Sequence, residues 1–145
     1  MTHGIDTDFL VALEITDHPF HLPADRLLAE LLNQGHDFAV APQTLAEFIH
    51  IVTDSKRMPN PLSMSDAISR AEQWWDAEEV IRVFPADGTA STFFTWLRRH
   101  HLGRKRLLDT MLAATMKEAG IRHLVTNNVG DYDGFGEFQI VSFCA

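Results

Sequence analysis

Four acidic residues stand in surroundings that are unusual for a charged side chain. Asp6 follows an apolar residue, Glu47 lies in a mostly apolar segment, and Asp109 follows two leucines. Asp131 comes later, in a loop rich in Asn and Gly. Buried carboxylates are costly unless a cation or hydrogen bonds satisfy them, and carboxylates that cluster repel one another unless a cation joins them. Oxygen ligands favour Mg²⁺ or Mn²⁺ over zinc, and such ions can promote hydrolysis of a phosphodiester.

Each of these acids also has an ordinary structural explanation. Asp6 fits a helix N-cap, and Asp109 would complement a helix dipole in the first turn. Glu47 can be a surface glutamate, and Asp131 sits in a segment whose composition favours a turn. Asp8 suits a helix N-terminus, where we expect it to interact with the dipole or with solvent. The metal hypothesis therefore depends on whether the fold gathers the four acids.

Basic residues are concentrated just before Asp109. The formal net charge is −8, with 12 Lys and Arg against 20 Asp and Glu, and this charge alone argues against a nucleic-acid binder. Yet five of the 12 basic residues fall within positions 98–106, and no acidic residue interrupts them. Such a run can contact a phosphate backbone, or it can be a solvated loop and helix end that complements the dipole.

The elements that would position these residues alternate between strand and helix. Apolar spacing predicts helices that begin near Thr7 and Pro42, and over 23–34, 89–100 and 107–119, with Leu108 facing the core of the last one. Ser65 is a suitable N-cap for one more helix, which would run through the two tryptophans. The predicted strands cover residues 3–6, 37–41, 80–84, 123–126 and 138–142.

This alternation predicts an α/β protein with a parallel sheet of about five strands and helices on both faces. In such sheets ligands bind beyond the carboxyl ends of the strands, near the point where the strand order reverses. Asp6 and the segment 126–131 follow two of the predicted strands directly. The expected fold therefore brings these residues to one edge of the sheet.

The composition limits the class of protein. The 145 residues fit a single domain over 1–145, and 46% hydrophobic with 22% charged residues indicates a globular core. No apolar run approaches the ~20 residues of a membrane helix, and the first residues lack the regions of a signal peptide. The single cysteine, Cys144, cannot form an internal disulfide, which agrees with a reducing compartment. We expect a cytoplasmic protein without a membrane segment.

Four segments of the chain, taken in order, resemble the motifs of PIN-domain nucleases. Residues 5–11 resemble the opening motif, and the segment that leads to Glu47 resembles the second acidic motif. Residues 108–114 resemble the third motif, and residues 126–132 resemble the final strand and loop. Each motif is one acid among aliphatic residues, but the ordered set of four is fairly specific and covers essentially the whole chain. A chain this short is similar to the VapC-type toxins of prokaryotic toxin–antitoxin systems.

The resemblance implies a single PIN-like domain that is a Mg²⁺- or Mn²⁺-dependent endoribonuclease. It also implies an RNA substrate, a cognate antitoxin and a homodimer. The catalytic and metal-binding residues that match the family by position are Asp6, Glu47, Asp109 and Asp131. Accessory polar positions of the last motif match Thr126 and Asn128. The basic residues expected to contact the RNA backbone are Arg99, Arg104, Lys105 and Arg106.

Three positions qualify the match to the family. Asp8 stands where the family often has Asn or Ser, so the site would carry one more negative charge. Tyr132 replaces the more usual Phe. Some members use the position of Asn128 in place of that of Asp131, so the fourth ligand position is open between these two residues, with Asp131 preferred.

Other classes of function are weighed against this one. The acids could be structural in a PIN-like binding module that acts through partner recognition. Glu47 and His50 have the Glu-x-x-His spacing of di-iron bundles, but a second pair is missing and the strands do not fit a bundle. A nucleotide-binding domain is disfavoured, because no glycine-rich phosphate loop follows the first strand.

Overall fold

Five short parallel strands form one central sheet in the computed structural model, which describes residues 1–144. The sheet has the order β3-β2-β1-β4-β5, and every neighbouring pair is parallel. The strand order therefore reverses between β1 and β4, which lie side by side at the centre. The predicted α/β fold is confirmed. The strands are β1 (Thr2–Ile5), β2 (Asp37–Val40), β3 (Val80–Arg82), β4 (His123–Val125) and β5 (Gln139–Val141).

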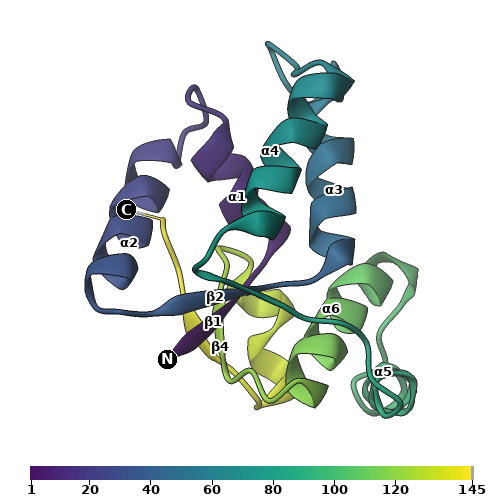
Figure 1. Ribbon diagram of the computed structural model, residues 1–145. Coiled ribbons are helices and arrows are strands. Elements are labelled where there is room, and N and C mark those ends of the chain that lie inside the picture. The colour runs from purple at the N-terminus through teal and green to yellow at the C-terminus, as the bar shows by residue number, and fades with distance from the viewer. Residues whose placement is uncertain (145) are drawn as a thin grey trace.

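Helices cover both faces of this sheet. Figure 1 shows α1 to α4 on one side of the strands and α5 with α6 on the other. The α-helices are α1 (Thr7–Glu14), α2 (His21–Asn33), α3 (Pro42–Val52), α4 (Met64–Asp76), α5 (Thr89–Arg99) and α6 (Leu107–Glu118). Short 3₁₀ helices are η1 (Arg104–Arg106), η2 (Val129–Asp131) and η3 (Asp133–Phe135). Within residues 1–144, none of these helices has the length and hydropathy needed to cross a bilayer.

Side chains that alternate in direction along each strand form a hydrophobic core on each face of the sheet. Ile5 and Val40 pack in the cluster formed with α1 to α4, whereas Ala39 and Leu124 pack with residues of α5 and α6. Successive side chains of a strand point to opposite faces, so a strand buried on both sides is apolar throughout. These buried strands hold the loops at their carboxyl ends in fixed positions.

Gly4 allows α6 to approach the middle of the sheet closely. A Cβ atom at this position would lie 3.0 Å from the Met116 sulfur and 3.2 Å from a methyl carbon of Leu124. All three residues are fully buried or nearly so. The close contact fixes α6, and with it the acid in the first turn of that helix.

Two local predictions were wrong. Ser63, and not Ser65, caps α4, because its hydroxyl accepts a 3.1 Å hydrogen bond from the N–H of Asp66. Leu108 is 60% exposed, although it was expected to face the core. It lies in the first turn of α6 beside Leu107, which is also exposed, so this side of the turn faces solvent while Thr110 is buried.

Candidate functional site

The site begins where β1 and β4 end side by side. Asp6 caps α1, is only 5% exposed, and accepts a 2.8 Å hydrogen bond from the Thr7 N–H. Its other carboxylate oxygen accepts a 2.8 Å bond from the hydroxyl of the buried Thr126. The cap explanation of Asp6 is thus confirmed. It does not exclude a role in a site, because one oxygen accepts from the helix and the other accepts from the loop after β4.

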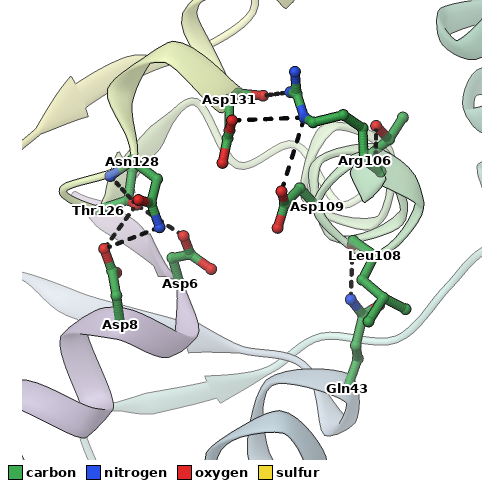
Figure 2. A network of polar contacts seen from close by, with 10 residues as sticks. Asp6, Asp8, Gln43, Arg106, Leu108, Asp109, Thr126, Asn128 and Asp131 are labelled. Atoms are coloured by element: carbon green, nitrogen blue, oxygen red, sulfur yellow. Dashed lines mark hydrogen bonds and ion pairs between the residues drawn. The ribbon is translucent and has the colours of Figure 1, made fainter. Parts of the chain in front are cut away.

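Asp8 lies next to Asp6 and contacts the same loop after β4. Its Oδ2 atom accepts a 2.8 Å hydrogen bond from the Asn127 N–H and lies 3.4 Å from the side-chain nitrogen of Asn128. Its Oδ1 atom is buried and has no hydrogen-bond partner among the described residues. Asp8 was expected to interact with the helix dipole or with solvent. It does stand in the first turn of α1, but the loop after β4 folds over its carboxylate and restricts its contact with solvent (Figure 2).

Glu47 is held in place by two neighbours. The Gln43 amide donates a 2.9 Å hydrogen bond to Glu47 Oε1, and the Thr7 hydroxyl lies 3.4 Å from Oε2. The same Gln43 amide nitrogen donates a 2.8 Å bond to the carbonyl of Leu108. Gln43 therefore links α3 to the start of α6 and orients Glu47 between them.

Asp109 and Asp131 meet around one arginine. The Nε atom of Arg106 lies 3.8 Å from Asp109 Oδ2 and 3.6 Å from Asp131 Oδ1. A terminal nitrogen of the same guanidinium donates a hydrogen bond to the main-chain carbonyl of Asp131. Figure 2 shows Arg106 turned toward these two acids, on the opposite side of the site from Asp8. Asn128 lies beside Asp8 and Asp131 beside Asp109, so both candidates for the fourth position border the site.

The carboxylates raise one another's pKa values. Burial, together with the charge of Asp6, raises the pKa of Asp8 to about 7. Burial, together with repulsion from Asp131 and Asp6 that Arg106 partly offsets, raises the pKa of Asp109 to about 7. Burial raises the pKa of Asp6 as well, although the hydrogen bonds that its carboxylate accepts lower this pKa in part. Such mutual repulsion is the condition that a bound cation relieves.

These residues fit a hard divalent cation. All the donors are oxygens, and the orphaned Oδ1 of Asp8 is a carboxylate atom that lacks a positive partner. Within residues 1–144, no three or more His, Cys, Asp or Glu side chains stand close enough together to hold a metal ion by themselves. An ion at this place would therefore need water ligands as well, and Mg²⁺ usually keeps several waters.

The basic segment is placed beside the acids. Arg99 ends α5, while Arg104 and Lys105 lie on η1, and all three are exposed. η1 leads directly into α6, the helix that carries Asp109. The three side chains are free for an anionic ligand, whereas Arg106 from the same run is engaged with the carboxylates.

Sequence reasoning did not single out Gln43, and it noted Tyr132 only as a departure from the family. Tyr132 is fully buried against Trp96 and α6, and its hydroxyl interacts with the carboxylate of Asp6. Burial raises the pKa of this phenol, and the charges of Asp6 and Asp109 raise it further. The replacement of the usual Phe was the one signal for Tyr132, and nothing in the local sequence marked Gln43.

A family model for the PIN domain matches residues 5–130. The ribonuclease VapC24 of Mycobacterium tuberculosis is 25% identical over 138 residues, which cover 92% of this chain and 90% of that protein.

Solved structures show the same fold. The sarcin–ricin-loop-cleaving toxin VapC20 of Mycobacterium tuberculosis superposes with a TM-score of 0.72 at 20% identity, over 94% of this chain and 96% of that one. VapBC2 of Rickettsia felis, solved with a DNA fragment from its promoter, gives a TM-score of 0.70 at 17% identity, over 99% and 100% of the two chains. The predicted resemblance is confirmed: this chain belongs to the PIN domain family.

Proposed function

We propose that this protein is a divalent-metal-dependent endoribonuclease that hydrolyses RNA phosphodiesters. The observation that carries the proposal is the gathering of five acids at the carboxyl edge of the sheet. One buried carboxylate oxygen among them, Asp8 Oδ1, has no partner. The name of the similar protein VapC24 supports the ribonuclease class. We also propose that residues 1–145 are this one domain. The acids are Asp6, Asp8, Glu47, Asp109 and Asp131.

We assign each residue of the site a role from its position. Asp6, Asp8 and Asp109 would hold Mg²⁺ or Mn²⁺, which supplies an activated water and neutralises charge on the phosphate. Glu47 is oriented by Gln43, so its carboxylate can accept a proton from the attacking water. Thr126 donates its hydroxyl hydrogen to Asp6 and fixes that carboxylate. Thr126 thus positions an acid, whereas the sequence had suggested only an accessory polar role.

The exposed basic residues support an RNA substrate. Arg99, Arg104 and Lys105 lie on the segment that leads into the helix of Asp109. They can hold the phosphate backbone beside the acids, where unscreened carboxylates alone would repel it. The net charge of −8 then describes the whole molecule and not the surface next to the site.

We propose that the protein acts in the cytoplasm as the toxin of a toxin–antitoxin pair, as a homodimer bound by an antitoxin. Similar solved structures include a toxin–antitoxin complex from Klebsiella pneumoniae. The chain also offers apolar grooves for protein partners. One between α2 and α4 is lined by Leu28, Leu32, Phe38 and Trp74, and one between α3 and α4 is lined by Leu45, Ile49, Ile68 and Trp75.

Cleavage of a defined RNA with mapped products tests the proposal. We expect cleavage by the wild type that requires Mg²⁺ or Mn²⁺ and stops on addition of EDTA. Asp6→Asn should abolish it, while Asp25→Asn, an exposed acid on α2, should retain it. Full activity of the Asp6 variant would reject the site. Absence of both cleavage and Mg²⁺-dependent thermal stabilisation in the wild type would favour the binding module.

A further inference from the structure

The negative charges of the acidic site are neutralised differently on its two sides, one formed by Asp6 and Asp8 and the other by Asp109 and Asp131. Asp6 and Asp8 receive hydrogen bonds from uncharged donors of the loop after β4. Asp109 and Asp131 face the guanidinium of Arg106. Among residues 1–144, Arg106 is the one Lys or Arg that forms an ion pair with any acid of the site. Positive charge is therefore already present in one half and absent from the other.

The position of Arg106 is set by the fold. Its side chain is 27% exposed, whereas Arg104 and Lys105 from the same 3₁₀ helix point to solvent. The Thr110 hydroxyl donates a 2.6 Å hydrogen bond to the Arg106 carbonyl, and the guanidinium donates to the carbonyl of Asp131. The first of these bonds anchors the backbone to α6, and the second anchors the charged group to η2.

The contacts of the guanidinium are those of a counterion. Its Nε atom is buried and has no hydrogen bond, yet it lies within 4 Å of an oxygen of each acid. A charge in such a place is stabilised by nearby opposite charge more than by directed bonds. Phosphodiester hydrolysis at a cluster of acids can use two metal ions a few ångströms apart. Here the guanidinium of Arg106 lies between Asp109 and Asp131 and supplies a positive charge to both acids.

We infer that Arg106 is an internal cation that takes the place of a second metal ion, so that the protein binds one divalent cation, held by Asp6, Asp8 and the oxygen of Asp109 that does not face Arg106. The inference rests on the proposed function and specifies its metal requirement. Arg106 is a positioning residue here, since it holds Asp131 beside Asp109 and neutralises both. It is no longer the RNA-backbone contact that the sequence suggested.

Counting bound Mn²⁺ tests the inference without an activity assay. Isothermal titration of the purified protein with Mn²⁺ alone, checked by electron paramagnetic resonance of the free ion, should give one ion for the wild type. Arg106→Gln removes the charge and keeps a donor for the Asp131 carbonyl, so it should bind two. Arg106→Lys keeps the charge and should bind one, and so should Arg98→Gln, which removes an exposed charge from α5.

The outcomes separate this inference from the proposed function. Two ions in the wild type, or one in Arg106→Gln, would overturn the role of Arg106 and leave a metal-dependent nuclease in place. No bound ion in the wild type would overturn both.

A second measurement covers the case in which Arg106→Gln does not fold. In wild-type protein saturated with Mg²⁺, the Nε–H nuclear magnetic resonance signal of Arg106, assigned by its loss in Arg106→Lys, should stay at its metal-free position. Movement of this signal to the value of a solvated arginine would show displacement by the ion and refute the inference.

Discussion

Asp8 shows how far the surroundings of a residue can depart from its local sequence. As the second residue of α1 it has the position of a dipole-compensating acid. Its carboxylate is nevertheless held by Asn127 and faces Asp6, and one of its oxygens has no partner. At the residue scale, the site is thus an arrangement of like charges in which Asp6 and Asp8 have no positively charged partner among the described residues.

Asp8→Asn should therefore weaken metal binding without reducing the stability of the metal-free protein. Asn keeps the acceptor for the Asn127 N–H and removes the charge, so we expect Mg²⁺ affinity to fall on the order of tenfold. The metal-free protein should be at least as stable as the wild type, because repulsion with Asp6 is gone. Calorimetric Mg²⁺ titration and thermal unfolding in EDTA check both points. Unchanged Mg²⁺ affinity would exclude Asp8 from the site.

At the scale of elements, the site depends on links between helices that the sheet alone does not position. Gln43 on α3 bonds both Glu47 and the Leu108 carbonyl at the start of α6. Gln43→Ala should lower kcat by about tenfold or more with little change in KM, because Glu47 loses its orienting donor. Steady-state cleavage rates measure this effect, with the exposed Gln73→Ala on α4 as the control. Equal losses in both variants would reject the orienting role.

The packing of α6 on β1 makes a second prediction at this scale. Gly4→Ala would place a Cβ atom 3.0 Å from the Met116 sulfur inside a filled core, and should reduce the free energy of unfolding by about 1–3 kcal/mol. Gly103→Ala, where no atom lies within 4 Å of the new Cβ and φ is negative, should be neutral or stabilising. Urea denaturation of both variants provides the comparison. Equal stabilities would show that α6 can shift freely.

At the scale of the whole molecule, the two ends of the sheet respond to pH in opposite ways. At the carboxyl edge, Asp8 and Asp109 have pKa values raised to about 7. The metal-free fold therefore loses stability there as pH rises from about 4 to about 7. At the other end, His3 packs against His36 and His123. Burial, with the charges of the other two histidines and of the chain amino group, lowers the pKa of His3 to about 4, although Asp37 acts in the opposite direction.

His3 should consequently make the fold sensitive to acid. The folded protein keeps His3 neutral down to about pH 4, whereas the unfolded chain takes up the proton below about 6.5. This stabilising contribution is present above pH 6.5 and is lost as pH falls toward 4, by about 2 kcal/mol near pH 4.5. His3→Gln should remove this contribution and leave the opposite effect of Asp8 and Asp109, whereas the exposed His50→Gln should keep the wild-type profile. Urea unfolding from pH 4.5 to 7 tests it, and parallel profiles for wild type and His3→Gln would contradict it.

The sequence by itself determined the alternation of strands and helices, and with it the edge of the sheet where Asp6 and the loop after β4 would meet. These features follow from periodicity and from capping, which act over a few residues. The ordered acids also determined the family resemblance that the PIN model confirms.

Only the tertiary structure decided which neighbours the polar side chains have. Asp8 meets Asn127 across 119 positions of the chain, and Gln43 meets Leu108 across 65. Leu108 is exposed and Arg106 turns to the acids because of where α6 begins relative to the sheet. Such contacts depend on how whole elements pack, and no local pattern of residues encodes them. The acids could therefore be found from the sequence, but the cation that already balances two of them could not.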